Sequence, residues 1–164
     1  MYDPIILALD GSDLAAEAIP HAIALARDFD AEILIVRAVE LPREYYEVAP
    51  YMAPAIASSL IDEAYEQAEA YVRSQVEALQ AKGLRARGRC RSGDPATVIL
   101  EAADEHRGGV VVIATHGRSG LSRWAMGSVA DRVVRHSPVP VLLIRSGQPI
   151  PAPRAEKAES TTNS

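Results

Sequence analysis

The chain is poor in the residues that mark extracellular and membrane-bound proteins. It has a single cysteine, Cys90, in 164 residues. An internal disulfide is therefore excluded, which is typical of a reducing compartment. The longest apolar runs fall well short of the roughly 20 residues that a membrane-spanning helix needs. The first residues, Met-Tyr-Asp-Pro, show no basic segment followed by an apolar run. We therefore expect a soluble, cytoplasmic protein without membrane insertion.

Basic charge is also scarce, because 17 Lys and Arg face 22 Asp and Glu and the net charge is −5. This balance argues against nucleic acid as a partner. Arginine nevertheless alternates with small or apolar residues from Leu84 to Arg91, a period that predicts a strand with one solvent-facing side. The row of arginines is either an anion or RNA surface, or an edge strand whose charges discourage strand addition. The acidity of the rest of the chain favours the edge strand.

The sequence offers no recognisable metal site. Cys90 has no cysteine or histidine at ligand spacing, so we expect it to be a small buried residue. His21, His106 and His136 fall in predicted helices without the spacing of metal ligands, and we assign them no role.

What the chain does have is a regular alternation of apolar runs and amphipathic segments. About 48% of the residues are apolar, enough for one folded domain. Strands are predicted at 5–9, 32–39, 84–91, 110–114 and 139–145, and helices at 13–28, 57–82, 95–106 and 128–136. This order predicts an α/β fold, a single doubly wound open parallel five-stranded sheet with helices on both faces. The domain covers 1–146, and the polar segment 147–164 is expected to be a disordered tail.

Two irregularities interrupt this pattern. Pro20 falls inside the first helix and is expected to kink it. The segment from Leu41 to Ala55 contains three prolines and three tyrosines without a clean period, and is expected to be a long loop that acts as a lid or a partner surface.

Ligands of such sheets bind outside the carboxyl ends of the strands, where the strand order reverses. The segment after the fourth strand contains Gly117, Gly120 and Gly127, followed by Ser128 at a helix start. Glycine lets backbone N–H groups approach an anion, and a helix N-terminus adds free donors, so the segment predicts a phosphate-binding loop. An alternative for Ser128 is a capping box with Asp131. Capping explains the serine but not the glycine-rich loop.

This loop resembles the signature of the universal stress protein family. Gly117, nine further residues and Gly127-Ser128 match the pattern of its ATP-binding members, in which another glycine stands where Ala114 is found here. The runs 5–12 and 137–145 also match, so the resemblance spans Tyr2 to Arg145. It implies a Rossmann-like fold, similar to the adenine nucleotide alpha-hydrolases, with ATP across the ends of the first and fourth strands.

The resemblance also implies a set of contacts. Asp10 would bond the nucleoside, or a magnesium ion on the phosphates. The alternative, which we favour less, is that Asp10 only starts the turn before the first helix. Ala8 and Leu9 lie beside Asp10, and Ala38 would offer backbone groups to the adenine edge. The remaining contacts would surround the ribose and phosphates: Ile113, Ala114, Gly117, Arg118, Gly127, Ser128 and Val129. The methyl group of Ala114 narrows the approach, so we expect weaker binding rather than none.

Aromatic residues and one histidine leave alternatives open. Tyr45, Tyr46 and Tyr51 either stack on the adenine or, as we favour, pack their own segment. His116 is either a catalytic base or a loop residue held by the backbone. The second is favoured, because the sequence shows no nucleophile paired with a base. Trp124 and Met126 are expected to pack the loop onto the body.

Three functions follow from these observations. The first is an ATP-binding regulatory module in the stress response, acting as a homodimer through strand 139–145 and on a regulatory protein partner. The second is a slow ATP hydrolase or nucleotidyl transferase, although no Walker motif, acid–base pair or two-metal carboxylate set is present. The third is a nucleotide-free dimeric scaffold, against which Gly117 and Gly127-Ser128 argue.

Overall fold

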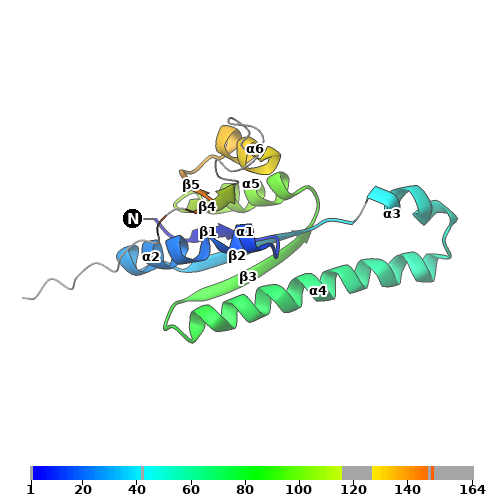
Figure 1. The fold of residues 1–164 in the computed structure, drawn as a ribbon, viewed down its shortest axis with the longest axis horizontal. Coiled ribbons are helices and arrows are strands. Elements are labelled where there is room, and N and C mark those ends of the chain that lie inside the picture. The colour runs from blue at the N-terminus through cyan, green and yellow to red at the C-terminus, as the bar shows by residue number, and fades with distance from the viewer. Residues whose placement is uncertain (1, 42, 116–126, 148, 150–164) are drawn as a thin grey trace, which may run out of the picture.

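A computed structural model describes residues 2–41, 43–115, 127–147 and 149, with the side chains of 43, 44 and 46 excepted. Five strands form one parallel sheet in the order β3-β2-β1-β4-β5 (Figure 1). The strands are β1 (Ile5–Ala8), β2 (Ile33–Val39), β3 (Ala86–Ser92), β4 (Val110–Thr115) and β5 (Val141–Arg145). The predicted fold class is confirmed. The expected tail at 147–164 lies almost wholly outside the described residues.

The central strands are apolar on both sides because helices cover both faces of the sheet. Ile5, Leu7 and Ile35 belong to the core under one layer of helices, whereas Ile6 and Val36 belong to the core under the other. All five side chains are at most 1% exposed. Continuous apolar runs rather than alternating ones are what such a doubly covered parallel sheet requires.

One face carries α1 (Asp13–Ala16), α2 (Ile19–Phe29) and α4 (Pro54–Gln80), and the other carries α5 (Pro95–Glu105) and α6 (Ser128–His136). Pro20 does more than kink the first helix. The helix ends after Ala16 and restarts at Ile19, which places Pro20 in the first turn of α2. A proline there costs no hydrogen bond, because first-turn N–H groups have no partner within the helix.

The long loop expected from Leu41 to Ala55 is wrong. This segment forms α3 (Arg43–Val48) and a 3₁₀ turn (Ala49–Tyr51), and α4 begins at Pro54. Pro50 and Pro54 each lie in the first turn of a helical segment, where proline starts a helix rather than breaking one.

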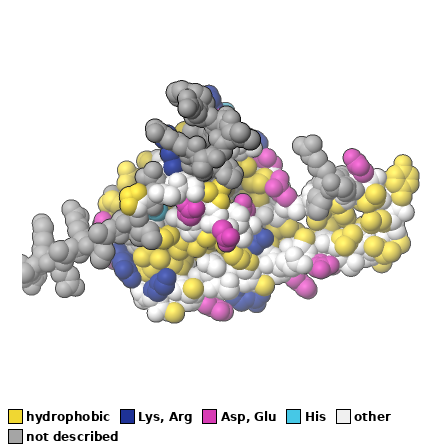
Figure 2. Space-filling model, in the orientation of Figure 1, with side chains coloured by type: hydrophobic (Ala, Val, Ile, Leu, Met, Phe, Trp, Pro, Cys, Tyr) yellow, Lys and Arg dark blue, Asp and Glu magenta, His cyan; other side chains and the backbone are white. Residues whose placement is uncertain are grey.

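The helices α3 and the start of α4 form an arm that projects beyond the sheet (Figure 1). Along α4, the first buried residue is Ala68. Apolar side chains gather on this arm (Figure 2), including Tyr51, which is 90% exposed. The Tyr45 hydroxyl donates to the carbonyl oxygen of Ala57 at 3.2 Å, so this tyrosine packs its own segment, as favoured from the sequence. The side chain of Tyr46 lies outside the described residues.

The strand rich in arginine is at the edge of the sheet, which confirms the edge-strand interpretation. Its arginines are paired with carboxylates of neighbouring elements instead of forming an open basic surface. The pairs, with their N–O distances, are Arg87–Glu32 at 2.7 Å, Arg89–Glu105 at 2.6 Å and Arg91–Glu101 at 2.6 Å.

The opposite side of β3 faces α4. Cys90 is partly buried there, and burial raises the pKa of its thiol. Gly88 lies so close to α4 that an added Cβ would be 2.1 Å from Cγ1 of Val72. Along β3, the arginines therefore face the solvent side, and the small residues between them face the closely packed helix α4. None of the helices in the described part of the chain is long and apolar enough to cross a membrane.

Candidate functional site

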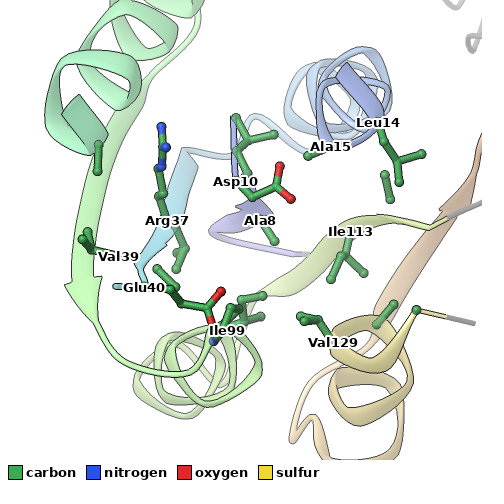
Figure 3. Close-up of a pocket in the computed structure, with 18 of the residues that line it drawn as sticks. Ala8, Asp10, Leu14, Ala15, Arg37, Val39, Glu40, Ile99, Ile113 and Val129 are labelled. Carbon is green, nitrogen blue, oxygen red and sulfur yellow. The ribbon is translucent and has the colours of Figure 1, made fainter. Parts of the chain in front are cut away.

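The strand order reverses between β1 and β4, and a pocket of about 490 Å³ opens at the carboxyl ends of the strands there (Figure 3). This volume is in the range of small-molecule sites. Nine residues implied by the sequence line it: Ala8, Leu9, Asp10, Ala38, Ile113, Ala114, Gly127, Ser128 and Val129. The others singled out in the loop lie outside the described residues: His116, Gly117, Arg118, Gly120, Trp124 and Met126.

Asp10 follows β1 and is exposed at the pocket (Figure 3). Its Oδ1 accepts a hydrogen bond from the N–H of Ser12 at 2.8 Å, while the Ser12 hydroxyl accepts from the N–H of Ala15 and caps α1. The turn-forming role of Asp10 is therefore real. It occupies one carboxylate oxygen and does not remove the side chain from the pocket.

The start of α6 forms the other end of the pocket, and here the alternative of a capping box at Ser128 is wrong. Gly127, not Ser128, is the N-cap, and among the described residues no side chain caps the helix. The carboxylate of Asp131 instead accepts from Arg135 Nε at 2.8 Å, and this hydrogen bond holds the pKa of Asp131 below its usual value. Ser128 and Val129 are the first helical residues, so their N–H groups lack partners within the helix and lie at the pocket wall.

Thr115, which the sequence analysis missed, joins the two ends of the glycine-rich segment. Its side chain is buried, and its Oγ1 accepts from the N–H of Gly127 at 3.2 Å. The N–H of Gly127 is therefore engaged, whereas the N–H groups of Ser128 and Val129 have no acceptor among the described residues. A Cβ at Gly127 would meet Thr115 Oγ1 at an ordinary 3.8 Å, so no described residue requires glycine here. The effect of glycine at position 127 is that this part of the pocket wall carries no side chain.

Arg37 is the second residue that the sequence analysis missed. It belongs to β2, lines the pocket and is partly buried. Its guanidinium carbon lies 4.8 Å from the centroid of the Tyr71 ring, and both terminal nitrogens lie 3.3 Å from where a Cβ of Gly11 would stand. Burial raises the pKa of the Tyr71 hydroxyl, while the charge of Arg37 lowers it. The available signal was an arginine near the end of an otherwise apolar strand.

The pocket therefore has two different ends and an apolar floor. Helix N–H donors lie at the α6 end, and the charged side chains of Asp10 and Arg37 lie near β1 and β2 (Figure 3). Val36, Ile99 and Ile113 contribute apolar surface between them. In the described residues, no group of three or more His, Cys, Asp or Glu side chains is placed to hold a metal ion.

Fold and pocket together define an open parallel α/β protein that presents a site at the carboxyl ends of its strands. The model of the universal stress protein family matches residues 1–145. The chain belongs to the universal stress protein family.

Individual relatives agree with this membership. A universal stress protein of Methanocaldococcus jannaschii is 32% identical over 151 residues, which cover 88% of this chain and 83% of the relative. Among solved structures, universal stress protein UspA from Lactobacillus plantarum is 25% identical with a TM-score of 0.70, covering 88% of this chain and 98% of that one. A universal stress protein in complex with cAMP is 26% identical with a TM-score of 0.64, covering 87% and 97%.

Proposed function

We propose that this protein is a regulatory module of the stress response that binds an adenine nucleotide, ATP, at the carboxyl ends of β1, β2 and β4. The observation that carries the proposal is the pocket itself. An apolar floor, a carboxylate at one end and the N-terminus of a nine-residue helix at the other are brought together from segments far apart in the chain. A helix N-terminus favours phosphate through its free N–H groups and its dipole.

The strand order gives the nucleotide a direction. Phosphates belong beside Ser128 and Val129, next to β4, whereas Ala38 lies at the end of β2, two strands away. Neighbouring strands are about 4.8 Å apart, so these ends are separated by roughly 10 Å. A nucleoside spans such a distance, with its base near Ala38 and its ribose between Asp10 and Ile113.

Two arguments support adenine nucleotides, and ATP among them. The similar structure in complex with cAMP points to the class of ligand. The sequence spacing of Gly117, Gly127 and Ser128 matches the ATP-binding members of the family. Gly117 and Arg118 would complete the phosphate end.

Magnesium would accompany the phosphates rather than occupy a site built by the protein alone. Asp10 retains one carboxylate oxygen outside its bond to Ser12, and Mg²⁺ is commonly held by one or two carboxylates together with substrate phosphates and water. The donor set therefore fits an ion brought in by the nucleotide. No observation in the described residues favours hydrolysis, so a regulatory role is proposed rather than catalysis.

The assembly we propose is a cytoplasmic homodimer that pairs through 139–145 and signals to a protein partner. β5 is the free edge of the sheet beside β4, and Leu142 on it is 36% exposed. An apolar edge strand needs a cover, and pairing with the same strand of a second copy supplies one.

The test is to purify the protein, denature it, identify any released nucleotide and titrate the protein with ATP, ADP, AMP and cAMP. Asp10→Asn keeps an oxygen for the Ser12 N–H but removes the charge, and should weaken binding. Asp62→Asn, on the exposed arm, is the matched control and should bind normally. Release of nothing together with no binding at millimolar ATP would favour the scaffold, and ATP turnover lost in Asp10→Ala would favour the enzyme.

A further inference from the structure

The arm formed by α3 and the start of α4 carries most of the large apolar side chains that the described fold leaves exposed (Figures 1 and 2). Four of the seven such side chains among the described residues lie on it: Val48, Tyr51, Ile56 and Leu60. Single exposed apolar residues are ordinary on a protein surface, whereas several on one short projecting segment mark an interaction site. The arm is therefore the surface that most needs a partner.

Two of these side chains begin an apolar stripe along one face of α4. Ile56, Leu60 and Ala64 follow one another at a spacing of four residues, so they lie on one face of the helix. Gln67 continues this face three residues later. Ala64 and Gln67 line the pocket, whereas Ile56 is 55% and Leu60 38% exposed on the arm beyond it. The exposed apolar stripe therefore leads to the mouth of the pocket.

The arm is acidic as well as apolar. Residues 44–72 include six Asp and Glu but no Lys, Arg or His. Glu63 lies on the same face as Leu60, three residues further along, and Glu66 follows after another three. Both glutamates are exposed, and neither is in an ion pair with a described residue. By contrast, Glu101 and Glu105 of α5 are paired with arginines of β3, so the charges of the arm are the ones available to a partner.

This combination of properties decides which occupant fits. A second copy that paired arm to arm would bring like charges together, which is unfavourable at an interface. The anionic surface of a membrane would repel the arm for the same reason. A segment with apolar residues on one face and Lys or Arg beside them matches both properties, because it covers the apolar stripe and places cations next to unpaired carboxylates.

We propose that the arm docks a basic amphipathic segment of a protein partner, which lies along Ile56 and Leu60 with its cations beside Glu63 and Glu66. The proposal names the surface and the class of partner for the regulatory role proposed above, and in that respect it rests on that role. The part of α4 on the arm, residues 54–67, is about 21 Å long, so it takes a helical segment of the same length. Such a segment would end at the mouth of the pocket, beside a bound nucleotide.

The experiment titrates the full chain with three fluorescent model peptides of the same length as this part of α4 and follows their anisotropy. The first is an amphipathic sequence of leucine and lysine, the second has glutamate in place of lysine, and the third has serine in place of leucine. The leucine–lysine peptide should bind about tenfold more tightly than either of the others, and added salt should weaken it. If it does not bind, or if another peptide binds as well, the proposed chemistry of the partner is wrong.

One pair of variants tests the apolar stripe. Leu60→Ser should weaken binding of the leucine–lysine peptide about tenfold, because the exposed leucine no longer buries apolar surface in the complex. Val134→Ser, which removes an exposed apolar side chain from α6, is the matched control and should bind like the wild type. Equal losses in the two variants would show that the peptide does not dock on the arm. Both residues are exposed, and a thermal melt of each variant checks that it is folded.

A second pair tests the charges. Glu63→Gln combined with Glu66→Gln should weaken the leucine–lysine peptide severalfold and reduce the effect of salt. Asp28→Asn combined with Glu77→Gln removes the same number of exposed charges outside the arm and should leave both quantities unchanged. If the two double variants behave alike, the peptide responds to the net charge of the protein and the proposed docking is wrong.

Each titration is run with and without ATP, so that docking and nucleotide binding are judged separately. A protein that binds ATP but not the leucine–lysine peptide would overturn the docking surface alone. A protein that binds the peptide through the arm but binds no nucleotide would support the docking surface and overturn the proposed nucleotide site. Self-association that Leu60→Ser abolishes, measured by light scattering, would show that the occupant is a second copy and would overturn the proposal.

Discussion

The hydroxyl oxygen of Thr115 accepts a hydrogen bond from the backbone N–H of Gly127 at 3.2 Å. Thr115 is the last residue of β4 and Gly127 is the N-cap of α6, so this bond joins the two ends of the glycine-rich segment. The carbonyl oxygen of Thr115 also accepts from the N–H of Ser146, just after β5. The start of α6 is thereby fixed to the centre of the sheet, with its free N–H groups at the pocket.

Replacing Thr115 by valine should weaken ATP binding while the fold persists. Valine keeps the shape but removes the acceptor for the Gly127 N–H, which costs about 1 kcal/mol and loosens the first turn of α6. We expect a severalfold rise in the Kd for ATP, measured by calorimetric titration. Thr115→Ser retains the hydroxyl and should bind like the wild type. Equal affinity of the valine and serine variants would show that the bond does not position the helix.

Replacing Ala114 by glycine should tighten ATP binding. Ala114 lines the pocket at the position where the ATP-binding pattern of the family has glycine, and its methyl group narrows the approach to the backbone. The variant should lose about 0.5–1 kcal/mol of folding stability, because glycine weakens a strand. Titration with ATP checks the first effect and urea denaturation the second. If the affinity changes by less than the error, the methyl group is irrelevant to the site.

Replacing Gly88 by alanine should destabilise the fold without touching the pocket. The new Cβ would lie 2.1 Å from Cγ1 of Val72, so β3 and α4 must separate. Overpacking of this kind costs about 1–3 kcal/mol in the free energy of unfolding, measured by urea denaturation. Adding Val72→Ala should make the double variant more stable than the sum of the two single losses predicts. Strictly additive losses would contradict the contact.

The cap of α5 gives the protein a defined dependence on pH. The Asp94 carboxylate accepts from the backbone N–H and the hydroxyl of Thr97, and these bonds, with the nearby charge of Arg132, hold the pKa of Asp94 below its usual value. Its stabilising effect is therefore complete above the unfolded pKa of about 3.9 and is lost as the pH falls through the lower folded value.

Asp94→Ala should accordingly lower the free energy of unfolding by about 1 kcal/mol at neutral pH. The difference from the wild type should begin to shrink below a pH of about 4, where the carboxylate of the unfolded chain becomes protonated, and should vanish once the folded carboxylate is protonated as well. Urea denaturation across this range measures it. Asp94→Asn, which caps the helix but does not titrate, serves as the comparison. A difference in the free energy of unfolding between wild type and Asp94→Ala that does not change with pH would contradict the capping role of the Asp94 carboxylate.

The proposed dimer predicts the effect of a charge on β5. Leu142→Asp should give monomers, because a carboxylate on this edge cannot be buried against its own copy. The control is Val134→Asp on α6, a residue that is 43% exposed and outside the edge strand. Light scattering after size-exclusion chromatography separates the outcomes. A wild-type monomer, or a Leu142→Asp dimer, would exclude pairing through this strand.

Much of the fold is predictable because it depends on local patterns. The run Ile5–Ala8 is buried on both faces, and an unbroken apolar run is the signature of that environment. Pro50 and Pro54 gave the wrong prediction because proline is compatible with both a loop and the first turn of a helix. The residues that follow each proline decide between a loop and a helix start, and here those residues are helical.

The site is predictable only where it depends on spacing. Gly127 and Ser128 were found because glycine and a helix start are adjacent in sequence. Thr115 and Arg37 were missed because their roles come from contacts over 12 and 34 residues of chain, with Gly127 and Tyr71 respectively. The capping box failed for a related reason, since Asp131 had a competing partner one turn later.

The most direct test of the central claim is photoaffinity labelling with 8-azido-ATP, followed by peptide mapping, with and without an excess of ATP. The account predicts labelling that ATP suppresses and that falls on peptides lining the pocket, such as 36–40 and 64–68. Labelling that ATP does not suppress would contradict it. So would labelling on the outer surface between α5 and α6, around Arg91 and His136.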